Sequence, residues 1–245
     1  VCAHMGWQTY IKTKDTNPVL LKVPESSIPL STYLGTVGMP GRTAYFGLNR
    51  VGKPRAEETL VVSAASGAVG TVVGQLAKSY GLKVIGIAGG PVKCSFVKDG
   101  LGFDACIDYK AGNLVNDLKA ACPNGVDIYF ENVGGEVTRA VAPLLNKGSR
   151  VPVCGFISQY NAKDIFETET PFHVLGKLNP KPVHRFFVVT EWADEWDKAT
   201  DEISKLIESN DLIYRETITK GFENAPQALR DVLTGKNFGK QIIEI

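Results

Sequence analysis

The sequence of 245 residues has no marked excess of charge, no low-complexity segment and no internal repeat. Lys and Arg number 27 against 26 Asp and Glu, which gives a net charge of +1. A chain so balanced offers no broad positive field to nucleic acid or an acidic membrane surface, so any basic site must be local. Hydrophobic residues make up 44% and charged residues 22%, values typical of a globular protein rather than of disorder or a coiled coil.

Patterns typical of disulfides and metal sites are also missing. The cysteines are odd in number and form no C-x-x-C pair, which argues against a disulfide framework and a cysteine-rich zinc site. They are Cys2, Cys94, Cys106, Cys122 and Cys154. The histidines, His4, His173 and His184, have no metal-ligand spacing. We therefore expect free thiols, no metal and, because the start carries no charged-then-apolar leader, a cytoplasmic protein.

One apolar stretch is open to two interpretations. Residues 59–77 contain no charge, and Gly70 and Gly74 have the G-x-x-x-G spacing of packed membrane helices. However, Ser63 and Gly67 interrupt the run where a membrane helix prefers a continuous apolar surface. A buried strand followed by a buried helix produces the same pattern, and we prefer that interpretation.

From residue 59 onward, patterns of strand and helix alternate. Apolar, β-branched runs predict strands at residues 59–64, 82–88, 104–108, 126–131, 150–154 and 185–190. Apolar residues at helical spacing predict helices after Gly70, from Pro91 to about Leu101, around Val137 to Leu145, and after the last strand. Such alternation builds βαβ units, so we expect an α/β fold of the doubly wound Rossmann type, with a parallel sheet between helices.

The flanks differ from this central part. Residues 1–42 are rich in Pro and Gly, whereas residues 212–245 contain a strand, a helix and a final strand. The chain starts without an initiator Met, and its first seven residues are typical of the interior of a strand region. We therefore expect a second domain that the chain leaves and re-enters, and a further N-terminal segment in the whole protein.

A glycine pattern follows the first expected strand. Gly67 allows a tight turn and a close approach to a pyrophosphate, while Gly70 and Gly74 allow the helix and strand to pack closely. The start of the helix would offer its N–H groups and the positive end of its dipole to phosphate oxygens. The alternative is that the glycines serve packing alone, but their place between strand and helix favours dinucleotide binding.

The end of the second expected strand indicates which dinucleotide. NAD-binding proteins place an Asp or Glu about twenty residues after the glycines, where it holds the ribose hydroxyls. Here Gly89 and Gly90 follow the strand and no acid is present, whereas Lys93 lies just beyond. A carboxylate would repel the 2′-phosphate of NADPH and Lys93 could pair with it, so we expect NADPH as cofactor.

Four motifs in order resemble one known family. They are Gly-Met-Pro-Gly-Arg-Thr-Ala-Tyr-Phe-Gly-Leu at residues 38–48, Ala-Ala-Ser-Gly-Ala-Val-Gly at 64–70, Glu-Asn-Val-Gly-Gly at 131–135 and Asn-Phe-Gly-Lys at 237–240. The chain resembles the zinc-independent medium-chain dehydrogenases/reductases, in the branch of leukotriene/prostaglandin, curcumin and alkenal double-bond reductases. That resemblance implies a GroES-like, β-rich catalytic domain at residues 1–42 and 212–245, a Rossmann domain at 43–211, and relatives longer at the N-terminus by roughly a hundred residues.

The resemblance also implies a function and a set of cofactor contacts. The function is NADPH-dependent hydride transfer to the β-carbon of an enone or enal; a quinone oxidoreductase of the same superfamily and a non-catalytic NADPH-binding protein are the alternatives. The residues expected to contact NADPH are Thr43, Gly67, Ala68, Val69, Gly70, Lys93, Tyr109, Asn132, Cys154, Gly155, Ile157, Ser158, Tyr160, Phe187, Val188, Val189 and Asn237. Taken singly, Cys154 and Phe187 could be core residues, and Asn132 and Asn237 could serve turns.

Two further expectations concern catalysis and assembly. Relatives often carry a Tyr shortly before the strand that holds Phe187, but residues 173–180 have none, so the proton donor is unknown; Tyr45 is more typical of a buried helical residue. The apolar strand at 185–190 comes last in the parallel sheet and should lie at an edge. Because relatives dimerise through this strand, we expect a homodimer that joins two sheets.

Overall fold

The structure is a computed structural model that describes residues 6–8, 10–14, 21–164 and 167–245. Cys2, His4 and most of the opening segment that was expected to be a strand lie outside the described residues. None of the helices in these ranges is long and apolar enough to span a bilayer. The uncharged stretch at 59–77 is a strand, a glycine loop and a helix, as expected.

A six-stranded parallel sheet forms the centre of the fold. Its strands follow the order β3-β2-β1-β4-β5-β6, which is the order of a doubly wound Rossmann sheet and confirms the expected α/β class. The strands are β1 Thr59–Ser63, β2 Lys83–Ala88, β3 Ala105–Asp108, β4 Val126–Phe130, β5 Leu145–Val153 and β6 Val183–Phe186. The order reverses between β1 and β4, so the connections that follow these two paired strands run to opposite faces of the sheet and leave a crevice at their carboxyl ends.

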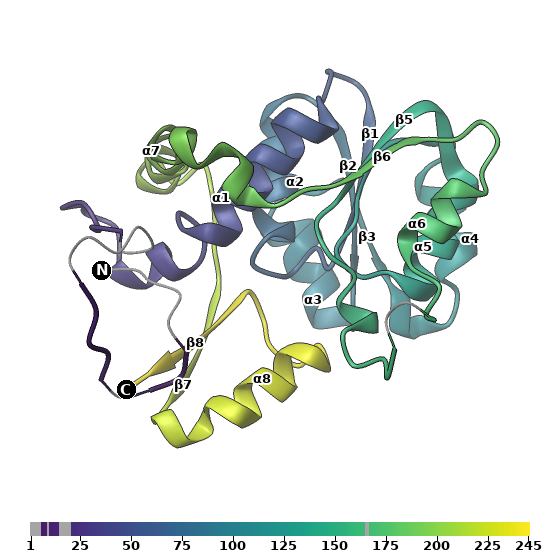
Figure 1. Cartoon of the computed structure of the whole chain (residues 1–245). Coiled ribbons are helices and arrows are strands. Elements are labelled where there is room, and N and C mark those ends of the chain that lie inside the picture. Colours follow the sequence, from purple (N-terminus) through teal and green to yellow (C-terminus); the bar gives the residue numbers. More distant parts are fainter. Residues whose placement is uncertain (1–5, 9, 15–20, 165–166) are drawn as a thin grey trace.

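Helices cover both faces of this sheet (Figure 1). Alternate strand residues point to opposite faces, so Val62 packs with α2 and Val61 with α5. The first face holds α1 Met39–Phe46, α2 Gly70–Ser79 and α3 Pro91–Ser95, with α7 Trp196–Glu208 packed against α1. The second face holds α4 Leu114–Ala121, α5 Gly135–Val141 and α6 Pro171–Gly176.

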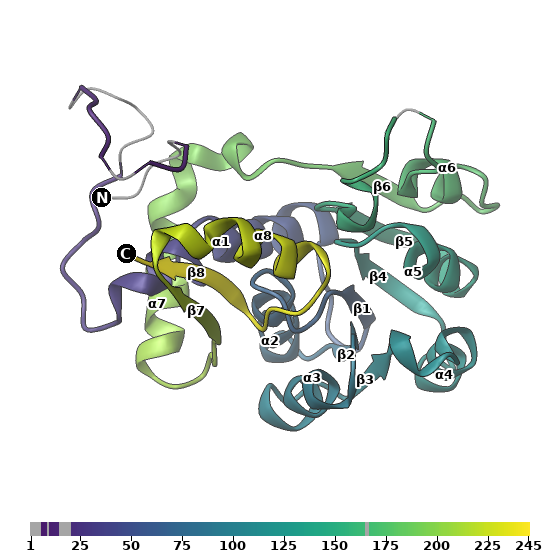
Figure 2. The same cartoon turned by 90° about the horizontal axis from the view of Figure 1, so that it is seen from below.

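The last part of the chain forms a small unit beside the sheet. Strands β7 Glu216–Lys220 and β8 Lys240–Glu244 pair in parallel, and α8 Ala225–Leu233 connects them. Both views place this unit on the side of α1 and α2, far from α4 and α6 (Figures 1 and 2). The expected boundary between residues 42 and 43 falls within α1, and the division into domains stays a prediction.

Two strands, β5 and β6, differ by several residues from the sequence-based expectation. The edge strand β6 ends at Phe186, not at residue 190, because the Glu191 carboxylate accepts the Val188 N–H at 2.9 Å and turns the chain into a short 3₁₀ helix from Val189. Leu145 was expected on a helix but begins β5, where the β4–β5 register shifts between Val126 and Ile128. The position of β6 at the edge is as expected.

Candidate functional site

A cavity of about 1170 Å³ lies at the carboxyl ends of the strands, beside the point where the strand order reverses. Several segments form its wall, five of which carry the argument below. They are the glycine loop after β1, the residues after β2, the turn after β4, the segment after β5, and the α8–β8 connection. Ligands bind at this position in open parallel sheets. The cavity is therefore the candidate site.

Close packing shapes the glycine loop. A Cβ on Gly70 would lie 2.4 Å from the Ala64 carbonyl oxygen and 2.8 Å from the Ala65 Cα, so only glycine fits there. A Cβ on Gly74 would lie 1.8 Å from the Phe103 ring, which occupies that space. The expectation that these two glycines allow close packing is confirmed, although the neighbour of Gly74 is a side chain from the loop before β3.

The start of α2 presents unused N–H groups to the cavity. The Gly67 N–H donates to the Ala64 carbonyl at 2.9 Å, but the N–H groups of Ala68, Val69 and Gly70 donate to no acceptor in the described part of the chain. All four residues line the cavity. Because the positive end of the helix dipole adds to these donors, the loop can hold the oxygens of a pyrophosphate.

The far end of the cavity, after β2, carries no carboxylate. Gly89 and Gly90 follow the strand, and a Cβ on Gly89 would meet the Tyr109 ring at 2.8 Å. The nearest acid, Asp108 at the end of β3, accepts the Gly90 N–H at 2.8 Å and the Lys110 N–H at 2.9 Å, and it does not line the cavity. The wall at this end therefore suits an anionic phosphate better than a pair of ribose hydroxyls.

Lys93 on α3 is the cation on this part of the wall. Its ammonium donates to the carbonyl oxygen of Gly235 at 2.8 Å and to that of Asn237. Burial, followed by the positive charge of Lys110, lowers the pKa of Lys93 below its usual range. A nearby phosphate would oppose that shift, because a negative charge favours the protonated ammonium.

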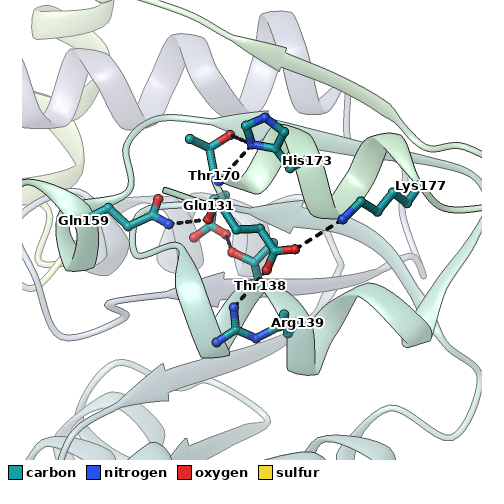
Figure 3. Close-up of polar contacts among 8 residues, drawn as sticks. Glu131, Thr138, Arg139, Gln159, Thr170, His173 and Lys177 are labelled. Carbon is teal, nitrogen blue, oxygen red and sulfur yellow. Dashed lines mark hydrogen bonds and ion pairs between the residues drawn. The ribbon is translucent and has the colours of Figure 1, made fainter. Parts of the chain in front are cut away.

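A buried carboxylate sets the turn after β4. Glu131 has no exposed surface, and its Oε1 accepts the N–H groups of Val133 at 2.7 Å and Gly134 at 3.0 Å. The Ser63 hydroxyl donates to the same oxygen at 3.1 Å, and the Thr138 hydroxyl donates to Oε2 (Figure 3). The turn is therefore built around one fully hydrogen-bonded charge.

Asn132, at the start of this turn, is fixed by Ser63. Its backbone N–H donates to the Ser63 hydroxyl and its side-chain amide donates to the Ser63 carbonyl, each at 2.8 Å. These bonds join the ends of β1 and β4, which form the floor of the crevice. The amide of Asn132 thus holds two strand ends together as well as lining the cavity.

The segment after β5 rests on the same turn. The Ser158 N–H donates to the Val133 carbonyl at 3.0 Å and its hydroxyl donates to that oxygen at 2.6 Å. A Cβ on Gly155 would lie 2.7 Å from the Tyr160 hydroxyl, so glycine makes room for that ring. Burial, with the charge of Glu131, raises the pKa of the Cys154 thiol to about 12, and the thiol is therefore protonated at neutral pH.

A group of polar contacts, not expected from the sequence, includes three residues of the cavity wall, Arg139, Gln159 and Glu169 (Figure 3). Glu169 pairs with Arg139 at 3.0 Å and with Lys177 at 3.4 Å, and the Arg139 hydrogen bond lowers the pKa of the Glu169 carboxyl. The Gln159 amide donates to the Glu169 carbonyl. These partners lie up to 30 residues apart and form no motif, so no signal in the sequence identified them.

Thirteen of the seventeen expected cofactor residues line this one cavity. They are Gly67, Ala68, Val69, Gly70, Lys93, Tyr109, Asn132, Cys154, Gly155, Ile157, Ser158, Tyr160 and Asn237. The other four are Thr43, Phe187, Val188 and Val189. Phe187 packs against Phe130, Val188 is half exposed, and Val189 is buried. The structure therefore does not bring these four residues to the cavity wall.

Other expected site features also have defined positions. Tyr45 lies on α1 with its hydroxyl toward Glu202, and burial raises its pKa well above the usual range. It does not line the cavity, in agreement with a packing role. Among the described residues, no group of three or more His, Cys, Asp or Glu side chains is arranged to hold a metal ion.

Comparisons with known proteins place the chain in a family. A family profile described as zinc-binding dehydrogenase matches residues 68–205. The NADPH-dependent curcumin reductase of Escherichia coli (strain K12) is 42% identical over 249 residues, covering 100% of this chain and 71% of that protein. The NADP-dependent 2-alkenal reductase of Nicotiana tabacum is 39% identical over 241 residues, covering 98% and 69%. The crystal structure of CurA from Vibrio vulnificus in complex with NADPH has a TM-score of 0.85 and 46% identity, covering 92% of this chain and 68% of that one.

The strand order and the glycine loop define a Rossmann-type dinucleotide-binding fold. The similarity extends over nearly the whole chain, well beyond the glycine loop. The chain belongs to the zinc-binding dehydrogenase family, in the medium-chain reductase branch of curcumin and alkenal reductases that its motifs predicted.

A substitution at Gly70 tests the close packing of the loop. Gly70→Ala should lower the free energy of unfolding by about 1–3 kcal/mol, because the new methyl group meets backbone atoms that must shift. Gly176→Ala is the control, since nothing lies within 4 Å of a Cβ there and its φ is not positive. Urea unfolding measures both. Equal stability of Gly70→Ala and the wild type would contradict the packing argument.

The raised pKa of Cys154 predicts slow alkylation. At pH 8 iodoacetamide should modify Cys154 in the folded protein about tenfold or more slowly than in urea, because little thiolate is present. The sign of the shift means that the rate should keep rising with pH well beyond the pKa of an ordinary thiol. Peptide mapping by mass spectrometry gives both rates. A folded-state rate at pH 8 equal to the rate in urea would contradict the prediction.

Proposed function

We propose that this protein is an NADPH-dependent reductase of carbon–carbon double bonds conjugated to a ketone or aldehyde. The observation that carries the proposal is that one cavity combines free N–H groups at the start of α2, a wall after β2 without carboxylate, and Lys93. The names of two relatives support the substrate class, since 2-alkenals are α,β-unsaturated aldehydes and curcumin contains enone groups.

The residues present fit an NADPH molecule. The N–H groups of Ala68, Val69 and Gly70, which donate to no acceptor in the described part of the chain, would hold the pyrophosphate. Lys93 and Tyr109 would receive the phosphate-bearing adenosine end, and the segment from Cys154 to Tyr160 would flank the other ribose. Thr43, Phe187, Val188 and Val189 remain proposed contacts of NADPH, although they do not line the cavity in this structure.

When bound, NADPH supplies a hydride for the β-carbon of the substrate. The residues of this chain would bind the cofactor and the substrate and orient them relative to each other. The Glu131 carboxylate fixes the turn that carries Asn132, and the packed segment after β5 fixes the wall beside it. Holding the two reactants in one orientation and excluding water lowers the barrier. The Cys154 thiol stays protonated and is not a nucleophile toward the electrophilic substrate.

The reaction class can be tested directly. We expect the full-length protein to oxidise NADPH with a 2-alkenal faster than with a quinone, and not with the matching saturated aldehyde. NADPH that carries deuterium at its transferable position should place deuterium on the β-carbon, as measured by NMR. Faster turnover of the quinone would favour the quinone reductase alternative, and no turnover would favour a non-catalytic binding protein. We also propose that no metal takes part; stoichiometric zinc whose removal abolishes activity would contradict this.

Cofactor preference is a second test. The wild type should bind NADPH more tightly than NADH, because no carboxylate follows β2 and Lys93 can pair with the 2′-phosphate. Lys93→Ala should cost about 1.5–3 kcal/mol of NADPH binding free energy, as expected for one charge-assisted contact. Isothermal titration calorimetry measures both. Equal affinities of the wild type for NADPH and NADH would contradict the predicted preference for NADPH.

We further propose a cytoplasmic homodimer that pairs through β6. This strand is the edge of the sheet, and Val183 and Phe186 are 64% and 47% exposed, so a hydrophobic edge is open to pairing. Light scattering should show a dimer at micromolar concentration. The double variant Val183→Lys with Phe186→Lys should be monomeric, because pairing would bury its charges, whereas Ile218→Lys on β7, also exposed, should stay dimeric. A wild-type monomer would refute the proposal.

A further inference from the structure

Lys93 makes a contact that simple phosphate recognition does not require. Its ammonium lies on α3, and both of its described acceptors are carbonyl oxygens of the connection between α8 and β8, at Gly235 and Asn237. These acceptors are 142 and 144 residues away in the sequence. The lysine therefore joins the Rossmann sheet to the small unit that contains β7, α8 and β8.

Residues 235–239, here named the latch turn, are also held by aromatic contacts. The Phe238 ring meets the Phe96 ring edge-on with centroids 4.9 Å apart. The Arg215 guanidinium lies over Phe238 at 4.1 Å, and the Lys93 ammonium lies 5.8 Å from the same ring. The Arg215 guanidinium also lies 5.7 Å from the Phe96 ring, so Phe96, Phe238 and Arg215 form one cluster that holds the latch turn.

The opposite side of the latch turn touches the glycine loop. The Gly239 N–H donates to the Ser66 carbonyl at 3.0 Å, and Gly239 forms a parallel bridge with Gly67. Gly239 has a φ of 68°, and a Cβ there would lie 1.9 Å from the Arg215 carbonyl oxygen, so no other residue fits. The position of the latch turn therefore sets the shape of the cavity wall next to the glycine loop.

The Lys93 ammonium has enough N–H donors to contact the latch turn and a phosphate at the same time. It carries three N–H donors, of which two point to the carbonyls of the latch turn and one remains for an anion on the cavity side. A phosphate bound there and the two carbonyl oxygens would share one ammonium, each accepting a different N–H donor, so that the ammonium would link the ligand to the latch turn. Holding the latch turn in place in turn keeps Lys93 at the cavity wall instead of in solvent.

We propose that Lys93 is a positioning residue for the latch turn as well as a phosphate ligand, so that the 2′-phosphate and the closure of the latch turn on the glycine loop reinforce each other. The inference rests on the proposed binding of NADPH. Coupling of this kind is reciprocal: a phosphate that stabilises the closed turn is itself bound more tightly by it. Lys93 thus affects the binding of every dinucleotide and not only of those with a 2′-phosphate.

Hydrogen–deuterium exchange of the ligand-free protein tests the positioning role. The Gly239 amide should exchange about tenfold faster in Lys93→Met than in the wild type, because the turn loses two charge-assisted hydrogen bonds. Lys93→Arg keeps a charged donor and should restore most of the protection. Lys110→Met is the matched control, since it removes a neighbouring charge whose ammonium lies over the Tyr109 ring at 5.8 Å. Unchanged exchange in β1 and α2 would show that the fold is intact.

Two ligand experiments complete the test. Adenosine 2′,5′-bisphosphate should slow the exchange of the Gly239 amide in the wild type, whereas 5′-AMP should not, because only the former carries the phosphate for Lys93. NADH affinity should fall about threefold or more in Lys93→Met, a smaller loss than that of NADPH. Calorimetry measures these affinities.

The outcomes separate the two proposals. Equal Gly239 exchange in Lys93→Met and the wild type would overturn the positioning role, as would an NADH affinity that the substitution leaves unchanged. Failure of the wild type to bind NADPH at all would overturn the proposed function instead, and exchange in the ligand-free protein would still report on the latch turn.

Discussion

Glu131 carries a carboxylate with no exposed surface at the point where β4 leaves the sheet. A buried charge is costly unless hydrogen bonds replace its water, and here two backbone N–H groups and the hydroxyls of Ser63 and Thr138 do so. Its backbone also bonds β5 through the Pro152 carbonyl and the Cys154 N–H. Glu131 therefore connects the ends of β1, β4 and β5 with the turn that carries Asn132.

The two sides of the cavity differ in their charge. On the side of β1 and β2, backbone N–H groups and the Lys93 ammonium present positive charge, and glycines keep side chains out of the way. On the side of β4 and β5, the buried Glu131 carboxylate organises the turn, and burial, together with the charge of Glu131, keeps the Cys154 thiol protonated. A ligand with phosphates at one end and a neutral, reactive ring at the other matches this division of charge.

Local sequence predicted the parts of this site that depend on local geometry. The roles of Gly67 and Gly70 follow from their place between a strand and a helix, and the lack of an acid after β2 could be read directly. The hydrogen-bond partners of Lys93 could not be predicted from the sequence, because only the fold of the whole chain brings Gly235 and Asn237 close to it. The end of β6 was missed because Glu191, a side chain outside the strand, takes the Val188 N–H and turns the chain away. Periodicity reports burial well, but it does not report which distant groups satisfy a backbone donor.

The latch turn gives the protein an order of assembly. The last strand of the main sheet ends at Phe186, so the sheet has all its strands before Gly235 to Gly239 have been made. During synthesis on the ribosome, the glycine loop therefore lacks its contact with the latch turn until residues 235–239 have been made and the Gly239 N–H can bond to Ser66. The cavity wall is therefore completed late. A growing chain contains every strand of the Rossmann sheet before it contains the last part of the cavity wall.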